Sequence, residues 1–309
     1  MLSVIPKNDI ESYKKYKDYR KYYDRYYLCK LQNMRCGLMN DKPDKYPVFV
    51  KPKINLSGGN KGCKKVKNES EFNRLNNEEL FWSEYLDGKE GSFDLVVYNG
   101  EVLYKIHYEI YHRENSYLED YKKVSNEGEF IYRDFVREHF RNYSGFLNIQ
   151  YRNDKIIELS LRLDSGGRFI TQGNNKKLIE ELNDYYKKPR RKEFSEVDNI
   201  YVFKISVLSP FIFIPPKVVL NRIIDVNYNY YVDLGERKSS ILNIYVNEYE
   251  NGRLLQKKLE LFYYLYNILL LYLFYYIYMN HPRKRYILLF LVIYLRYLVI
   301  EDKLIEKLN

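Results

Sequence analysis

The stretch that most constrains the fold is residues 47–63, which read PVFVKPKINLSGGNKGC. An apolar run at 47–50 predicts a short strand that carries Lys51 at its end, and the chain becomes extended again at Val66. The loop between them has glycine at 58, 59 and 62, and glycine lets backbone N–H groups turn toward an anion. A plain hairpin turn also favours Gly and Asn. The segment therefore predicts strand, loop and strand, and leaves open a phosphate-binding loop or a simple turn.

More strands are predicted downstream. The apolar run 81–86 is followed by a turn near Gly88 and a returning strand over 92–97. Asn99-Gly100 is a strong hairpin signal and leads into a strand at 102–107. These residues predict an antiparallel sheet.

A second hairpin is predicted from residues 147–151 and 156–162 around Asn153-Asp154. Glu158, Ser160 and Arg162 alternate with apolar residues, so they should share one face of the strand. This hairpin places three polar side chains in a row.

The order of these segments resembles the ATP-grasp superfamily, especially its carbamoyl-phosphate synthetase-like and biotin carboxylase-like members. The resemblance spans roughly residues 10–188 and rests on order and spacing. It implies an α+β fold in which two subdomains grip a nucleotide, with a C-terminal β-then-helical extension. The domains it implies are an N-terminal helix with the remnant of a preceding domain (1–40), the ATP-grasp domain (41–188), a linker (189–200) and an extension with two apolar helices (201–309).

The resemblance also implies a nucleotide site, a metal site and catalytic residues. The residues implied for ATP are Arg25, Lys51, Ser57, Gly58, Gly59, Lys61, Gly62, Glu84, Tyr85, Leu86 and Glu90. Among them Lys51 matches the strand lysine on the phosphates, and 84–86 match the adenine hinge. Gln150, Glu158 and Ser160 match the positions that bind Mg²⁺ or Mn²⁺. Arg162 and Lys51 are the implied catalytic residues.

The chain departs from the family pattern at two metal positions. Ser160 stands where the family has asparagine, and Gln150 stands where many members have a carboxylate. Mg²⁺ prefers hard oxygen ligands and is often held by one or two carboxylates, so we expect a weak site. Only a short segment precedes Lys51, where family members carry a complete domain, which leaves the acceptor site open.

The expected function is an ATP-dependent ligase that activates a carboxylate as an acyl phosphate and joins it to an amine or a similar nucleophile. The alternative is a degenerate, non-catalytic ATP-grasp module that binds nucleotide or acts as a scaffold, with or without membrane association. The expected partners are ATP, a carboxylate and an amine.

Composition narrows the remaining classes of function and partner. The net charge is +10 and there are 36 tyrosines, a bias typical of a very AT-rich genome. Lysine is then the codon-favoured surface residue, and no specific nucleic-acid partner is expected. Residues 1–9 lack the apolar segment of a signal peptide, which favours a cytoplasmic location.

Candidate metal and redox residues are few. Cys29, Cys36 and Cys63 have neither zinc spacing nor an even count for a disulfide framework. His107 and Glu109 share a strand face, which fits either a pair of metal ligands or a partly exposed strand.

Helices are predicted at 8–32, with Asn8 or Asp9 as the cap, and at 69–77, 132–142 and 176–186. Residues 187–192 read as a solvated linker. Prolines at 210, 215 and 216 predict short strands or edge strands over 200–219, and 241–249 alternates like a strand before Asn251-Gly252.

Residues 261–280 contain no charged side chain, and this uncharged segment has the length of a membrane span. Their seven tyrosines and Asn267 oppose insertion, and the basic run 281–285 would lie on the far side of the membrane from an ATP-binding region. Two buried or mutually packed helices and membrane contact through 261–300 both stay open, the former being favoured.

Overall fold

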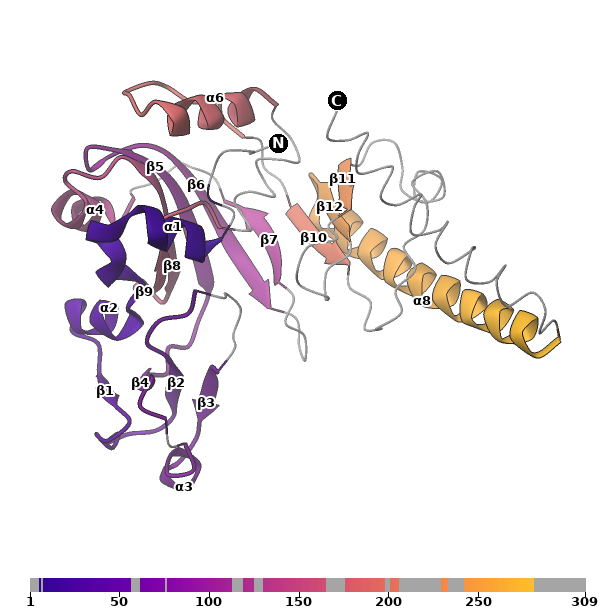
Figure 1. Ribbon diagram of the computed structural model, residues 1–309, viewed down its shortest axis with the longest axis horizontal. Helices are drawn as coiled ribbons and strands as arrows, with labels where there is room; N and C mark the ends of the chain where they lie inside the picture. The colour runs from indigo at the N-terminus through magenta and orange to yellow at the C-terminus, as the bar shows by residue number, and fades with distance from the viewer. Residues whose placement is uncertain are drawn as a thin grey trace. The chain divides into compact units, whose positions relative to one another are not determined.

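The computed structural model describes residues 6, 8–56, 62–75, 77–112, 119–124, 130–164, 176–197, 201–205, 229–232 and 242–280 (Figure 1). The chain divides into two compact units. We call residues 2–111 and 121–199 the N-terminal unit, and residues 112–120 and 200–309, which cluster with residue 1, the C-terminal unit.

The N-terminal segment forms three short helices: α1 (Asp9–Lys15), a 3₁₀ helix η1 (Lys17–Tyr23) and α2 (Arg25–Leu31). The prediction of one helix over 8–32 is therefore wrong. Tyr16 leaves the helical conformation and ends α1. Asp24 is also non-helical and caps α2, because its carboxylate accepts hydrogen bonds from the backbone N–H groups of Tyr26 (2.9 Å) and Tyr27 (3.1 Å). The predicted cap at Asn8 is confirmed by its bond from Glu11 N at 3.0 Å.

A small antiparallel sheet follows, with strands in the order β1 (Cys36–Leu38), β4 (Leu80–Glu84), β2 (Val48–Pro52) and β3 (Lys64–Val66). The strands predicted at 47–50, 66 and 81–86 are confirmed. The helix α3 (Glu69–Phe72) is shorter than predicted and packs Phe72 into the small core, together with Val48, Val50, Val66 and Trp82.

In the N-terminal unit, the large sheet has its strands in the order β7 (Glu119–Lys123), β6 (Glu101–His112), β5 (Glu90–Tyr98), β8 (Gly145–Arg152) and β9 (Lys155–Ser160). The pairs β5–β6, β5–β8 and β8–β9 are antiparallel, so both predicted hairpins are confirmed. Their turns use Asn99, Gly100, Asn153 and Asp154 at positive φ, the conformation that these residue types tolerate best.

Helices cover this sheet and bury its apolar side chains. The rings of η1 and the helix α4 (Arg133–His139) pack on β5, β8 and β9, and their core includes Tyr22, Phe93, Phe140, Leu147 and Ile149. The predicted helix at 176–186 is confirmed as α6 (Lys176–Lys187), and α4 is shorter than predicted.

The chain after α6 stays on the N-terminal unit. Asp184 pairs with Arg190 at 2.7 Å and with Lys192 at 3.4 Å, and Arg191 pairs with Glu101. Val197 is buried, and its carbonyl oxygen accepts a hydrogen bond from Lys123. The basic run is therefore held by ion pairs and is not only a solvated linker.

In the C-terminal unit, β12 (Leu242–Val246) pairs antiparallel with both β10 (Tyr201–Ile205) and β11 (Asn229–Val232). The strand predicted over 241–249 is present as the shorter β12, and Asn251 and Gly252 lie in the first turn of the long helix α8 (Tyr249–Asn280). A Cβ on Gly252 would collide with the side chains of Phe203 and Val246, so glycine lets α8 pack closely on the strands.

Helix α8 is only partly buried. Leu259 and Tyr263 are buried, whereas Leu265, Ile268 and Leu269 are exposed. Of the helices described, none has both the length and the apolarity needed to cross a membrane. The predicted second helix after residue 280 and the prolines at 210–216 lie outside the described residues.

Candidate nucleotide-binding site

Lys51 connects the two sheets of the N-terminal unit. Its strand β2 lies between β3 and β4 in the small sheet, opposite Phe81. The side chain is buried, and Nζ donates a long hydrogen bond of 3.3 Å to the carbonyl oxygen of Ile157 in β9 of the large sheet. The predicted strand lysine therefore points at the second predicted hairpin.

Arg25 reaches the same place from the start of α2. Its backbone N–H donates to the carbonyl oxygen of Lys53 at 2.8 Å, which anchors α2 to the end of β2. Its side chain is 5% exposed, and Nη2 forms an ion pair with Oε2 of Glu158, which is 27% exposed. Nη1 is buried and has no hydrogen-bond partner among the described residues. Such a donor normally needs an acceptor.

The electrostatics confirm that these groups are neighbours. Burial lowers the pKa of the Lys51 ammonium; Cys29 and Glu158 act against this, and Arg25 adds to it. Burial also raises the pKa of the Cys63 thiol, while Arg25 and Lys51 act to lower it. Two buried cations thus share one carboxylate, an arrangement with local excess positive charge that suits an anion.

Gln150, Glu158 and Ser160, the predicted metal ligands, lie on paired strands. Gln150 is directly opposite Glu158, and Asn148 is opposite Ser160. Ser160 is 3% exposed, so its hydroxyl is less accessible than the carboxylate of Glu158. Within the described ranges, no three His, Cys, Asp or Glu side chains gather in a way that could hold a metal ion. The donor set is one carboxylate, one amide oxygen and one hydroxyl.

The predicted hinge residues follow β4. The backbone N–H of Glu84 donates to the carbonyl oxygen of Arg35 at 2.8 Å. Leu86 packs against the apolar cluster of Cys29 and Phe81, and the Tyr85 ring has Lys65 Nζ 3.6 Å from its centre. The hinge is thus attached to the small sheet.

Glu90 and the glycine-rich loop are the remaining predicted nucleotide contacts. Glu90 is buried at the start of β5 and pairs with Arg152 on β8. Ser57, Gly58, Gly59 and Lys61 lie outside the described residues. Gly62 is described: its φ is +75°, and a Cβ there would lie 3.1 Å from Pro52 Cγ, so this position requires glycine.

Arg162 has a partner that the sequence did not indicate. Its Nε and Nη2 bind the two carboxylate oxygens of Asp9 at 2.9 and 2.5 Å, and Nη1 donates to the carbonyl oxygen of Leu163 at 2.9 Å. Burial acts to lower the pKa of Arg162, but Asp9 and Asp164 outweigh it and raise that pKa. This ion pair fixes α1 against the end of β9.

A buried polar network beside Arg162 was also missed. Asn148 Nδ2 donates to Ser92 Oγ at 2.7 Å and to Asp94 Oδ1 at 2.9 Å, and the same Oδ1 accepts from Asp164 N at 2.9 Å. Burial, and then the Asp164 carboxylate, raise the pKa of Asp94 to about 8. The only sequence signal was the presence of polar residues in otherwise apolar strands.

His107 lies in an aromatic cluster. Its ring stacks on Phe93 with centroids 4.1 Å apart, and its Nε2 is 2.7 Å from the Tyr151 hydroxyl. Burial lowers the pKa of His107 to about 4, so the imidazole is neutral near pH 7. Glu109 accepts a hydrogen bond from the Tyr111 hydroxyl at 2.6 Å. The partly exposed strand is the reading that these contacts favour.

The chain is similar in structure to several solved proteins. An L-amino acid ligase from Bacillus licheniformis matches with a TM-score of 0.56 and 14% identity, over 79% of this chain and 71% of that chain. An N5-carboxyaminoimidazole ribonucleotide synthetase in complex with ADP has a TM-score of 0.58 and 15% identity, over 79% and 72%. The biotin carboxylase domain of the Hydrogenobacter thermophilus 2-oxoglutarate carboxylase has 0.53 and 15%, over 75% and 63%. No protein-family model and no curated protein sequence matches.

Lys51 links the two sheets, and the Arg25–Glu158 ion pair lies beside it, so the N-terminal unit is an α+β structure built of two sheet-containing parts. The likeness to these solved structures shows that the chain has the ATP-grasp fold.

Proposed function

We propose that the protein is an ATP-dependent ligase of the ATP-grasp type, which activates a carboxylate and joins it to an amine or a similar nucleophile. The observation that carries the proposal is the convergence of Arg25 and Lys51 beside Glu158, with Arg25 Nη1 buried and unpaired in the described part of the chain. A phosphate oxygen is the acceptor that would satisfy this donor. The ligase, the synthetase and the carboxylase domain with a similar fold support the same class.

The Arg25–Glu158 ion pair has a defined role in this proposal. Without nucleotide, Glu158 neutralises Arg25 and offsets part of the charge of Lys51. When triphosphate enters, its oxygens become the partners of both cations, and the carboxylate of Glu158 is released from Arg25. The pair thus offsets part of the positive charge of the site until the substrate arrives.

The residues fit a divalent cation, although weakly. Gln150, Glu158 and Ser160 offer only oxygen donors, which suits Mg²⁺ or Mn²⁺. A bound Mg²⁺ would neutralise charge on the phosphates during transfer. Because Ser160 is buried, Glu158 would be the main ligand.

The proposed chemistry has two steps. A carboxylate oxygen of the first substrate attacks the γ-phosphorus of ATP, the bond from that phosphorus to the bridging oxygen breaks, and ADP leaves. The amine then attacks the acyl carbon, phosphate leaves, and the amine loses a proton. Lys51 and Arg25 hold the phosphates in place and stabilise their charge. The predicted catalytic role of Arg162 becomes a positioning role, because Asp9 occupies its guanidinium.

The direct test is calorimetric titration of the protein with ATP, with and without Mg²⁺, followed by phosphate-release assays over amino acids and short peptides. We expect saturable ATP binding that Arg25→Met weakens at least tenfold, since a charge-assisted hydrogen bond contributes about 1.5–3 kcal/mol. Arg74→Met, at an exposed arginine, is the matched control. Equal ATP affinity in wild type and in folded Arg25→Met protein would contradict the proposal.

A non-catalytic nucleotide-binding module is the second candidate. Two observations favour it: the metal site has one carboxylate, and Arg162 is held by Asp9. The two candidates differ in turnover. ATP binding that depends on Arg25 and Lys51, without phosphate release for any carboxylate–amine pair, would select the non-catalytic module.

A further inference from the structure

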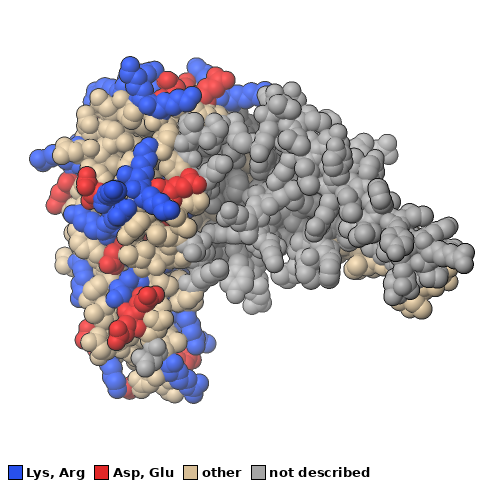
Figure 2. All heavy atoms as spheres, viewed as in Figure 1, with Lys and Arg blue, Asp and Glu red and all other residues tan. Residues whose placement is uncertain are grey.

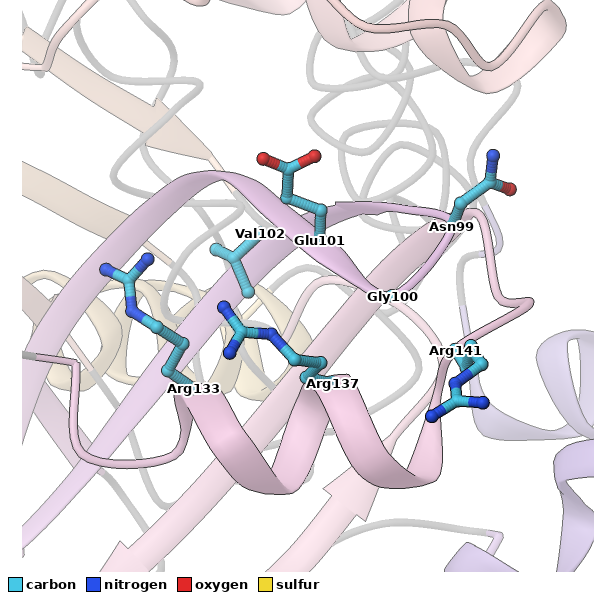
Figure 3. Close-up of a pocket in the computed structure, with 7 residues that line it drawn as sticks. All are labelled: Asn99, Gly100, Glu101, Val102, Arg133, Arg137 and Arg141. Atoms are coloured by element: carbon cyan, nitrogen blue, oxygen red, sulfur yellow. The ribbon is translucent and has the colours of Figure 1, made fainter.

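We propose that a second site, the arginine pocket, binds a small phosphate-bearing anion with two or more negative charges. The pocket has a volume of about 250 Å³ and is lined by Asn99, Gly100, Glu101, Val102, Arg133, Arg137 and Arg141 (Figure 3). Its ligand class follows from its shape, its charge and its distance from the nucleotide site.

Arg133 and Arg137 are four residues apart and therefore lie on one face of α4, while Arg141 lies in the turn that follows the helix. Figure 3 shows Arg133 and Arg137 side by side on α4 with their guanidinium groups extending toward Val102, and Arg141 next to the turn at Gly100. The β5–β6 hairpin supplies the opposite wall.

Hydrogen bonds hold this hairpin turn in place. Gly100 N donates to the carbonyl oxygen of Tyr143 at 3.1 Å, and Asn99 N donates to Ser144 Oγ at 3.0 Å. Gly100 has a φ of +78°, and a Cβ there would lie 2.7 Å from Arg141 Cα. The turn and the arginine segment therefore fit closely, and the pocket is built before any ligand binds.

The charges of the pocket are poorly balanced. Among the described residues, Arg133 and Arg141 have no carboxylate partner. Arg137 approaches only Asp134, at 3.7 Å, with side chains 71% and 94% exposed, a geometry that contributes little. Glu101 is paired with Arg191. The lining thus contains three arginines and one carboxylate, which leaves two positive charges for a ligand to neutralise.

The pKa of Lys105 also reflects the positive charge of the arginine pocket. Burial lowers the pKa of its ammonium, and Arg133 lowers it further, while Glu196 acts in the opposite direction. The face of the N-terminal unit visible in Figure 2 shows Lys and Arg interspersed with Asp and Glu. The arginine pocket therefore differs from the mixed surface seen there.

A phosphate group is the anion that this arrangement fits best. Each guanidinium presents parallel N–H donors that bind two oxygens at once. A terminal phosphate has three oxygens and about two charges, so two arginines can share it, while a planar carboxylate offers two oxygens. The excess of two positive charges matches a phosphate dianion.

The arginine pocket is separate from the candidate nucleotide site. Ser92 lies opposite Gln150, which in turn lies opposite Glu158. Gly100 is eight residues further along the β5–β6 hairpin, roughly 25 Å at the rise of an extended strand. One phosphate chain therefore does not occupy both.

The test is calorimetric titration with pyrophosphate and inorganic phosphate, using the full chain at low salt. To exclude binding at the nucleotide site, the titrations use the Lys51→Met background beside wild type. We expect Lys51→Met to retain one pyrophosphate site, and Arg133→Gln/Arg137→Gln added to it to weaken that site at least tenfold. Arg74→Gln is the matched control, expected to leave the affinity unchanged, and circular dichroism checks that each variant is folded.

Three outcomes would overturn the proposal. The first is loss of all pyrophosphate binding in Lys51→Met. The second is equal affinity with and without Arg133 and Arg137. The third is citrate binding as tightly as pyrophosphate, because a tricarboxylate would then satisfy the arginine pocket without any phosphate.

Discussion

Replacing Lys51 with methionine should separate stability from nucleotide binding. The Lys51 ammonium is buried, burial lowers its pKa, and its only hydrogen bond among the described residues is 3.3 Å long. Methionine has a similar length and carries no charge, and Arg25–Glu158 remains as a pair without it. Replacing a poorly compensated buried charge by an apolar side chain is often neutral or stabilising. We therefore expect the free energy of unfolding to stay unchanged or to rise by up to about 2 kcal/mol.

ATP affinity should change in the opposite direction. The Lys51→Met substitution would remove one charge-assisted hydrogen bond to phosphate. Such a bond contributes about 1.5–3 kcal/mol, so the dissociation constant for ATP should rise about 10- to 150-fold. Urea unfolding gives the stability and calorimetry gives the affinity. Lys53→Met, two residues along and half-buried, is the matched control. A Lys51→Met protein that is less stable by about 2 kcal/mol or more but binds ATP like wild type would refute the reasoning, because Lys51 would then be a structural residue.

Three further predictions concern the buried charges and the tight packing. Because the pKa of Asp94 is raised to about 8, the Asp94 carboxyl of the folded state keeps its proton up to that pH. The free energy of unfolding should therefore fall as pH rises from about 4 to 8, by up to about 1.4 kcal/mol per pH unit from this group. Urea unfolding should show this slope in wild type and not in Asp94→Asn. A wild type and an Asp94→Asn protein with parallel pH profiles would show that Asp94 ionises normally. Asp9→Asn should cost about 3–5 kcal/mol because it leaves Arg162 buried without its partner, and a loss below 1 kcal/mol in thermal or urea unfolding would argue against that pair. Gly252→Ala should destabilise the C-terminal unit by about 1–3 kcal/mol, since the new methyl collides with Phe203; unchanged thermal unfolding would mean that α8 can shift away.

Local patterns predicted most of the strands in the N-terminal unit. The Asn-Gly and Asn-Asp turns and the apolar runs specify the β5–β6 and β8–β9 hairpins, because turn geometry and side-chain period act over a few residues. The break at Asp24 is local as well: an aspartate before a helical run is an N-cap signal, although the aromatic residues around it continued the apparent helical period.

The candidate site depended on contacts that local patterns do not contain. Arg25 and Glu158 are 133 residues apart, and only the packing of α2 on β9 brings them together. The Arg162–Asp9 pair has the same origin. Such pairs follow from the tertiary fold, so the sequence could suggest the residue types but not their partners.

The buried polar network shows where the period-two rule fails. Ser92 and Asp94 sit in a strand whose residues from Glu90 to Val97 are all buried. A strand covered on both faces has no solvent side, so its polar residues must bind each other. A similar limit holds for α8, whose apolar residues occur on its buried and exposed sides alike.

The central claim is that Arg25 and Lys51 bind the phosphates of a nucleotide. A crystal structure of the protein with ADP and Mg²⁺ tests it most directly. We predict phosphate oxygens within hydrogen-bond distance of Arg25 Nη1 and Lys51 Nζ, with the Glu158 carboxylate separated from Arg25. A nucleotide bound elsewhere, with the Arg25–Glu158 pair intact and Nη1 still unpaired, would contradict it.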